Sequence, residues 1–139
     1  MAVDSTTQER NKALVQKSFD SWVGGTGSPF DLLAQEAEWT IVGSSPLSKT
    51  YPSKQEFLDN VIHPFNARMA TRLIPTVKGI YADGDTVITL FDATATAKDG
   101  LRYHNTYTWY FQFNGANVVK ALAFFDTRDF DEFWTRVKP

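Results

Sequence analysis

The chain has 139 residues, a formal net charge of −2 and no cysteine. Its length predicts a single domain, residues 1–139, with room for a sizeable core. The near-neutral balance argues against a nucleic-acid or membrane-surface partner, and the lack of cysteine excludes disulfides and thiolate metal sites. The first five residues lack a basic region and an apolar run, so we expect no secretory leader, no membrane span and a cytoplasmic location.

The first 42 residues predict two helices and a strand. A capping box followed by apolar residues at helical spacing predicts an amphipathic helix over residues 6–23, which ends at Gly24. Proline at a first helical position predicts a short helix from Pro29 to about residue 37. Residues 38–42 follow as a brief strand.

A second capping box at residues 53–56 opens a further helix. Proline has no backbone N–H and its ring crowds the preceding helical turn. We therefore expect this helix to be disturbed or broken at Pro64 and to resume towards Met69.

Four strands separated by tight-turn residues follow, and a last amphipathic helix ends the chain. The expected strands are residues 72–82, 86–97, 102–113 and 118–126. Pro75 places the first of them at a sheet edge or a bulge. Helices first and antiparallel hairpins afterwards predict an α+β fold, with the helices on one face of a strongly curved sheet.

The third strand alternates with period two and carries a face rich in aromatic residues. The members of this face are Tyr103, Asn105, Tyr107, Trp109, Phe111 and Phe113. Such a face is either the core under a helix layer or the wall of a ligand cavity. The sequence leaves both interpretations open.

The pattern around these strands resembles the SnoaL-like branch of the nuclear-transport-factor-like superfamily. The residues that carry the resemblance are Gly84-Asp85-x-Val87, Lys98-Asp99-Gly100-x-x-Tyr103-x-Asn105-x-Tyr107-x-Trp109-x-Phe111 and Phe124-Phe125-Asp126-Thr127. The resemblance implies a cone, in which a curved mixed or antiparallel sheet wraps around the N-terminal helices and a C-terminal helix follows. It also implies a pocket between sheet and helices, and a homodimer.

The resemblance makes Asp126 similar to the catalytic aspartate of polyketide cyclases. Phe91, Ala93, Trp39 and Ile41 stand where the related limonene epoxide hydrolase has polar catalytic groups, so the hydrolase machinery is missing. Other departures make the pocket apolar for this branch: Leu122 and Ala123 replace a charged pair, and Phe124 replaces a tyrosine.

Asp126 has two interpretations. Strand alternation puts it on one face with Lys120, Leu122 and Phe124, where a desolvated carboxylate would serve as a general base. It also stands where a strand meets a helix, with Asp129 three residues later, as an N-cap would.

Asn105 and Tyr107 are candidates for holding an oxyanion, or else for hydrogen bonds inside a packed sheet. His63 would turn towards the pocket or cap carbonyl groups, and His104 would face away from Asn105. Neither histidine belongs to a metal-binding pattern, so we expect no metal and no cofactor.

The sequence thus predicts a protein that binds an apolar or polycyclic small molecule, as a cofactor-independent cyclase or isomerase using acid–base chemistry. Asp126 would be the base, and Asn105 or Tyr107 would stabilise the oxyanion. The substrate-binding walls would be Phe19, Trp22, Trp39, Ile41, Phe91, Trp109 and Phe124. The alternative is a non-catalytic binding or assembly module of the same fold. The outward face around His104, Thr106 and Tyr110 would meet the partner of a homodimer.

Overall fold

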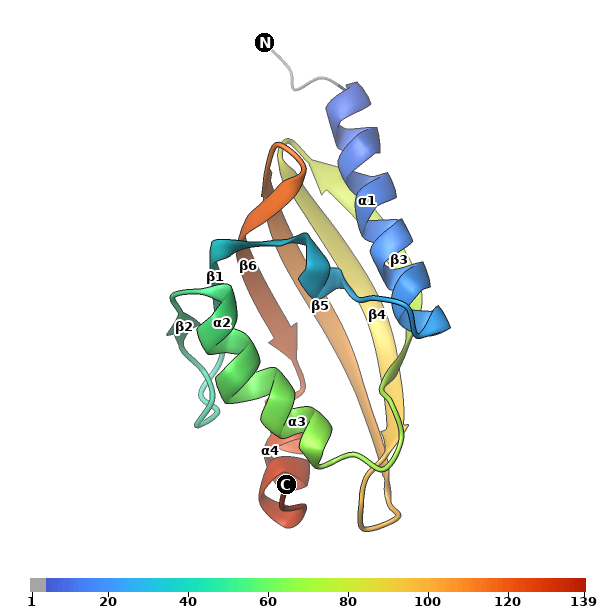
Figure 1. Cartoon of the computed structure of the whole chain (residues 1–139), viewed down its shortest axis with the longest axis vertical. Helices are drawn as coiled ribbons and strands as arrows, with labels where there is room; N and C mark the ends of the chain where they lie inside the picture. The colour runs from blue at the N-terminus through green and yellow to red at the C-terminus, as the bar shows by residue number, and fades with distance from the viewer. Residues whose placement is uncertain (1–4) are drawn as a thin grey trace.

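The computed structural model describes residues 5–139, so most of the segment inspected for a leader lies outside the described residues. Its strands form a six-stranded sheet in the order β2-β1-β6-β5-β4-β3 (Figure 1). The elements in chain order are α1 (Ser5–Gly24), η1 (Pro29–Leu32), β1 (Leu33–Ile41), β2 (Thr50–Tyr51), α2 (Lys54–Phe57), η2 (Leu58–Ile62), α3 (His63–Ala67), β3 (Ile74–Asp83), β4 (Thr86–Thr96), β5 (Arg102–Asn114), β6 (Asn117–Phe125) and α4 (Thr127–Arg136).

The sheet is mixed. β3, β4, β5 and β6 form an antiparallel meander, and β1 joins it in parallel beside β6. The sheet is curved and does not close, and α1 and the α2–α3 segment lie over one of its faces (Figure 1). The predicted α+β fold, with a curved mixed sheet around helices and a C-terminal helix, is therefore confirmed. Pro75 lies in β3, which is an edge strand as predicted.

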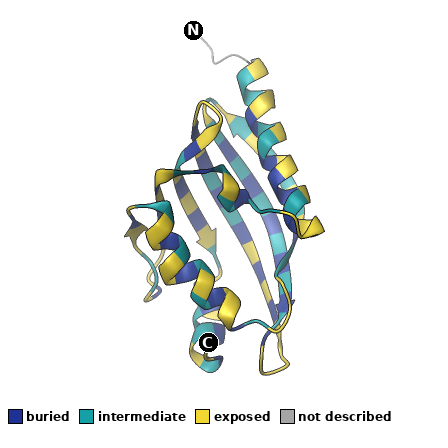
Figure 2. Ribbon diagram, viewed as in Figure 1, coloured by how far each residue is buried: buried dark blue, intermediate teal, exposed yellow. Residues whose placement is uncertain are grey.

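Buried residues, dark blue in Figure 2, alternate with exposed ones along the strands and helices, and the main buried cluster has members from α1, β1, α2, β4, β5 and β6. Every predicted member of the aromatic face of β5 is buried, while residues between them are exposed or half-buried. A second, smaller cluster forms where α4 packs near the end of the sheet. Its buried members are Phe65, Ala97, Tyr103, Phe130, Phe133 and Val137.

The second predicted helix is wrong beyond its first turn. Ser28 caps the 3-10 turn η1 and Pro29 begins it, but β1 starts at Leu33 instead of residue 38. In the sequence, Leu32 and Leu33 were interpreted as apolar residues of a short helix. In the structure, Leu33 instead pairs with Val118 of β6. Tertiary pairing therefore overrides the local helical pattern here.

Pro64 disturbs its helix without breaking it. The five residues before α3 form the π-helical turn η2, in which the His63 N–H bonds to the Leu58 carbonyl. Pro64 then occupies the first turn of α3, which continues to Ala67. A proline tolerates the first turn of a helix because its missing N–H is not needed there.

The predicted phase of the last strand is wrong for its second half. The register between β5 and β6 shifts near Phe113 and Val118, so one residue of β6 is left out of the pairing. An extra residue moves every later side chain to the other face of a sheet. Ala121 and Ala123 consequently face the core, and Leu122 and Phe124 face outward.

Candidate functional site

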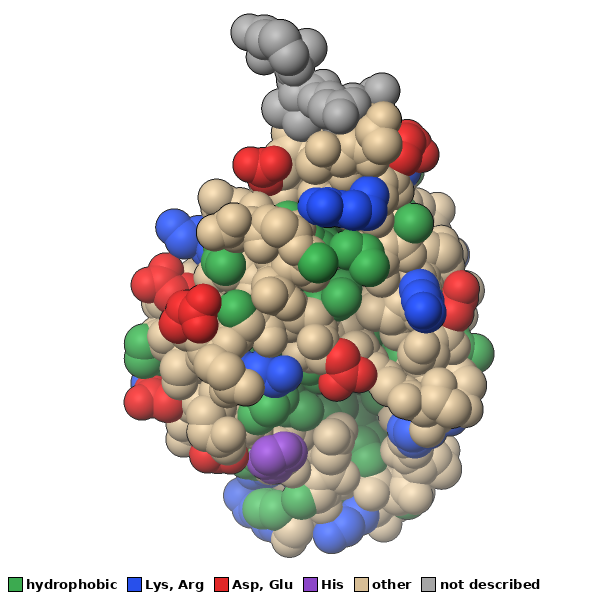
Figure 3. All heavy atoms as spheres, turned by 45° about the horizontal axis from the view of Figure 1, so that its top comes forward, with side chains coloured by type: hydrophobic (Ala, Val, Ile, Leu, Met, Phe, Trp, Pro, Cys, Tyr) green, Lys and Arg blue, Asp and Glu red, His purple; other side chains and the backbone are tan. Residues whose placement is uncertain are grey.

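A cavity of about 710 Å³ lies between the sheet and the helices, within the size range of small-molecule pockets. Its lining comes from β1, β4, β5 and β6 on the sheet side, from the α2–α3 segment, and from the end of α1 with η1. Figure 3 shows a hollow on this side of the molecule, where hydrophobic side chains lie between charged ones. The fold thus leaves space where the sheet and the helices diverge.

Aromatic rings hold one another in place along this cavity. Trp109 meets Trp39 edge to face at 5.0 Å between ring centroids, and meets Phe91 at 4.7 Å. Trp22 lies parallel to Trp109 at 6.1 Å, and Phe57 stacks on Trp39 at 4.1 Å. Each ring is fixed by a neighbour, so the aromatic wall exists before any ligand arrives.

Ionisable side chains line the cavity at its rim. The Asp31 carboxylate accepts a hydrogen bond from a backbone N–H of its own turn, and the Arg72 guanidinium donates to carbonyls at the end of α1. His63 lies on the lining with its Nδ1 atom 3.5 Å from the Asp59 carboxylate. Lys54 completes this rim, and Asp31 is the only acid among the described lining residues.

Tyr107 brings a hydroxyl to the cavity and is buried. Its oxygen lies 2.7 Å from the Tyr103 hydroxyl, which also accepts a hydrogen bond from Asn105 Nδ2. Either hydroxyl can donate in this pair, and the arrangement in which Tyr103 donates leaves the Tyr107 proton for the cavity. Burial raises the pKa of Tyr103 to about 12 and that of Tyr107 well above its ordinary value. Both phenols are therefore neutral donors at physiological pH.

Asn105 is fully engaged inside the protein. Its Nδ2 group donates to the Tyr103 hydroxyl and to the Asp126 carbonyl, each at 3.0 Å. Its Oδ1 atom accepts from the backbone N–H groups of Thr106 at 2.8 Å and Asp126 at 3.0 Å. An amide has two donors and two acceptor positions, so none is left for a ligand. The predicted oxyanion role of Asn105 is wrong, and Asn105 instead fastens the end of β6 to β5.

Asp126 caps α4. Its Oδ1 atom accepts hydrogen bonds from the backbone N–H groups of Arg128 at 3.0 Å and Asp129 at 3.2 Å. The residue is exposed and does not line the cavity. Of the two interpretations from the sequence, the structure shows the capping arrangement. A carboxylate in this position does not reach a ligand in the cavity.

Most of the predicted walls do lie together. The cavity is lined by Trp22, Trp39, Ile41, Phe91 and Trp109. Phe19 is different, because it packs behind this layer with its ring 4.9 Å from Phe91. Phe124 is on the outer face of the sheet, 43% exposed, so its predicted place in the wall is wrong.

The sequence analysis missed the walls that the helices contribute. The missed members from η1, the α2–α3 segment and α4 are Phe30, Phe57, Leu58, Val61, Ile62, Phe65 and Phe130, and β6 adds Phe125. The helical spacing of Phe57, Val61 and Phe65 was a signal for one buried stripe on the α2–α3 segment. That stripe alone does not say whether it meets a packed core or a cavity.

Within the described part of the chain, no three His, Asp or Glu side chains gather closely enough to hold a metal ion. No helix of residues 5–139 combines the length and the apolar character that a membrane crossing requires.

No protein-family model matches the sequence, and no curated protein matches it. Solved structures do match the fold. Bal32a, from a soil-derived mobile gene cassette, is similar with a TM-score of 0.75 and 20% identity, covering 92% of this chain and 98% of that one. An NTF2-like protein of unknown function from Burkholderia pseudomallei has a TM-score of 0.72 and 17% identity, covering 90% and 97%.

A third similar structure is described as a putative SnoaL-like polyketide cyclase from a Jannaschia species. Its TM-score is 0.66 at 16% identity, covering 91% of this chain and 92% of that one. Likeness at these identities shows the fold and carries no activity with it. The chain therefore has the nuclear-transport-factor-like fold, the fold of the SnoaL-like proteins that its sequence resembles.

Proposed function

We propose that this protein binds an apolar, planar small molecule in the cavity between the sheet and the helices. The observation that carries this proposal is the cavity of about 710 Å³ with ring-lined walls and its charged groups at the rim. The ring planes of Trp39 and Trp109 lie at 85° to each other, and both residues line this cavity. A flat ring system fits such a wall, because offset stacking and edge-to-face contacts add to the burial of apolar surface.

Filling the cavity tests this function. Ile62→Trp adds a large ring from the helix side of the lining, where Ile62 is half-buried. We expect this variant to bind fluorene, a planar hydrocarbon, at least about 10-fold more weakly, since the added ring takes the space that the probe needs. Quenching of tryptophan fluorescence measures the binding.

Leu101→Trp is the matched control, because Leu101 lies in the turn before β5, is 55% exposed and does not line the cavity. This control should bind fluorene as the parent protein does and should keep the same unfolding midpoint. The function is rejected if the parent protein fails to bind fluorene, or if Ile62→Trp binds it with unchanged affinity.

The second candidate function is cyclase- or isomerase-type acid–base chemistry at the same cavity. Tyr107 offers a neutral O–H donor from the wall, and His63 offers a basic nitrogen at the rim. The Asp59 carboxylate lies 3.5 Å from Nδ1, and Nε2 is the nitrogen that would accept the substrate proton. In this function His63 takes the role that the sequence analysis assigned to Asp126.

A homodimer through the outer face of β5 and β6 is also part of the proposal. This face exposes apolar side chains, with the Tyr110 and Phe124 rings 5.7 Å apart and Leu122 beside them in the sheet. Light scattering at micromolar concentration should give about twice the 15.7 kDa chain mass. Leu122→Lys should shift that mass towards one chain, whereas Leu101→Lys, in the exposed turn before β5, should not. A single-chain mass for the parent protein contradicts the dimer.

A further inference from the structure

Two indole N–H groups in the cavity wall have no partner. Trp39 is 2% exposed and Trp109 is 6% exposed, and neither indole nitrogen makes a hydrogen bond to any described residue. The one fully enclosed side-chain polar atom without a partner in residues 5–139 is Asn11 Nδ2. Both indole nitrogens are therefore accessible, and the cavity is the space that these two buried side chains border.

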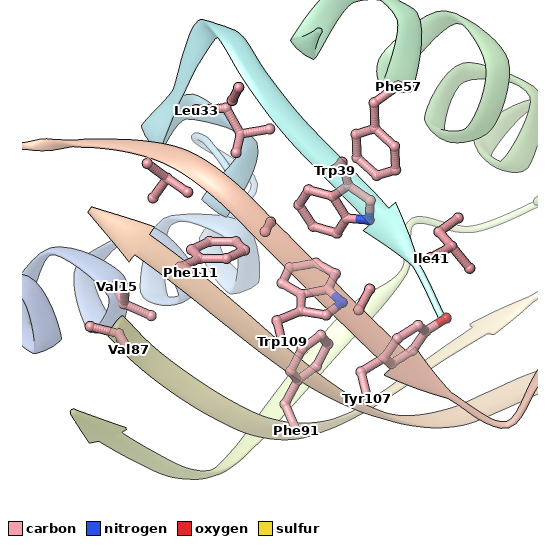
Figure 4. Close-up of a cluster of buried hydrophobic side chains, with 14 of the residues drawn as sticks. Val15, Leu33, Trp39, Ile41, Phe57, Val87, Phe91, Tyr107, Trp109 and Phe111 are labelled. Atoms are coloured by element: carbon pink, nitrogen blue, oxygen red, sulfur yellow. The ribbon is translucent and has the colours of Figure 1, made fainter. Parts of the chain in front are cut away.

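These donors lie on the same side of the wall. Figure 4 shows the nitrogens of Trp39 and Trp109 and the hydroxyl of Tyr107 all turned towards Ile41, which lines the cavity as they do. The rings of Trp39 and Trp109 have centroids 5.0 Å apart, and those of Trp109 and Tyr107 are 6.1 Å apart. The inner wall thus presents hydrogen-bond donors in a setting that is otherwise apolar.

Buried hydrogen-bond donors without a protein partner determine which ligands bind well in the cavity. A buried N–H that a hydrocarbon ligand covers loses its solvation without gaining a partner, which weakens binding. A ligand oxygen with lone pairs supplies that partner. No carboxylate lines the inner wall among the described residues, so no charged acceptor meets a ligand hydroxyl or amine there. The wall accordingly favours an oxygen that accepts hydrogen bonds and donates none.

We propose that the indole N–H groups of Trp39 and Trp109 are specificity-determining donors that bind the carbonyl oxygen of a planar, conjugated ketone or quinone. The inference rests on the proposed function and deepens it, since it names the chemical class of ligand for the same cavity. The ring system stacks among the aromatic walls, and its carbonyl points to the indole pair. Tyr107 supplies a third donor to the same region.

The matched probes are 9-fluorenone and fluorene, which share their ring skeleton and differ by one carbonyl oxygen. The parent protein should bind fluorenone about 10-fold more tightly, as two hydrogen bonds of modest net strength allow. In ¹⁵N–¹H spectra, the indole signals of Trp39 and Trp109 should move to higher proton frequency with fluorenone and not with fluorene. This measurement uses the unmodified protein and does not depend on a variant folding.

Substitutions then assign the effect. Trp39→Phe and Trp109→Phe each keep a ring and remove the N–H, so the preference for fluorenone should fall several-fold in each. Phe57→Leu is the control for a lost ring, because Phe57 stacks on Trp39 and has no donor. It should weaken both probes equally and leave their ratio unchanged.

The outcomes separate the two proposals. Equal binding of both probes by the parent protein, with no indole shift specific to fluorenone, overturns the donor role and leaves the apolar binding function intact. A preference that persists in both Trp→Phe variants overturns it as well. Failure of the parent protein to bind either probe overturns the binding function and the donor role together.

Discussion

Replacing Asn105 by alanine is expected to lower the free energy of unfolding by about 3 kcal/mol. Asn105 is 2% exposed and makes four hydrogen bonds. Alanine leaves the N–H and the carbonyl of Asp126 without their partner, together with the Thr106 N–H and the acceptor position of Tyr103. Buried polar groups that lose a partner cost about 1–3 kcal/mol each, and water reaching the exposed end of β6 offsets part of this sum.

Chemical denaturation with a two-state fit measures this loss. Asn114→Ala is the matched control, because Asn114 is an exposed asparagine at the end of the same strand, and it should change the free energy of unfolding by less than about 0.5 kcal/mol. A loss below about 1 kcal/mol in Asn105→Ala would show that the network contributes little. In that case the amide would again be a candidate for ligand binding.

The sequence predicts the β5 face correctly because that strand obeys one rule along its whole length. Its six inward residues alternate without interruption, and all six are buried. The Asp-Gly and Asn-Gly turns fix where the neighbouring hairpins reverse, so the meander follows from the same local signals. Local periodicity and turn chemistry are sufficient wherever no extra residue enters a strand.

β6 shows where that reasoning ends. The same alternation places Phe124 and Asp126 towards the cavity, whereas the bulge near Val118 turns Phe124 outward. A bulge is a property of the pairing between two strands, and the sequence of β6 contains no local signal that predicts it. The start of β1 was predicted wrongly for a related reason. Its parallel partner β6 lies about 80 residues further along the chain, so local sequence does not reveal the pairing.

The cavity was predictable in kind and not in detail. The aromatic residues of β1, β4 and β5 were assigned to it correctly, because strand phase gives their direction. The roles of the polar residues were not assigned correctly, because each role depends on the hydrogen-bond partner that the residue meets in the folded structure. Asn105 and Asp126 make hydrogen bonds that hold the junction between β5, β6 and α4 together. Among the described residues, the indole N–H groups of Trp39 and Trp109 are donors without a protein partner, and the sequence analysis assigned these residues to the wall without a hydrogen-bonding role.

Hydrogen-bond donors in the inner wall and the imidazole of His63 at the rim would together suit proton abstraction from a carbon next to a carbonyl group. An oxygen bound by N–H and O–H donors becomes a better electron acceptor, which makes the adjacent C–H more acidic. A base at the rim then needs to reach that carbon. His63 lies on the cavity lining, whereas Asp126 caps α4 and does not line the cavity.

His63→Gln is therefore expected to slow protein-catalysed hydrogen–deuterium exchange of 2-tetralone, a bicyclic ketone with acidic C–H groups, by about 100-fold. The imidazole accepts a proton from C1, the enolate oxygen is held by the wall donors, and the base returns a deuteron from solvent to the same carbon. ¹H NMR of the ketone in D₂O measures the rate after the buffer reaction is subtracted.

Two variants make this measurement decisive. His104→Gln removes the other histidine, which is exposed on the outer side of β5, and Asp126→Asn keeps a capping oxygen while removing the carboxylate. Both should exchange 2-tetralone at the rate of the parent protein. A loss confined to Asp126→Asn would restore the aspartate as the base, against its position in the structure. A parent protein that binds the ketone without accelerating its exchange would have the cavity and the donors of a binding protein, and no base placed to use them.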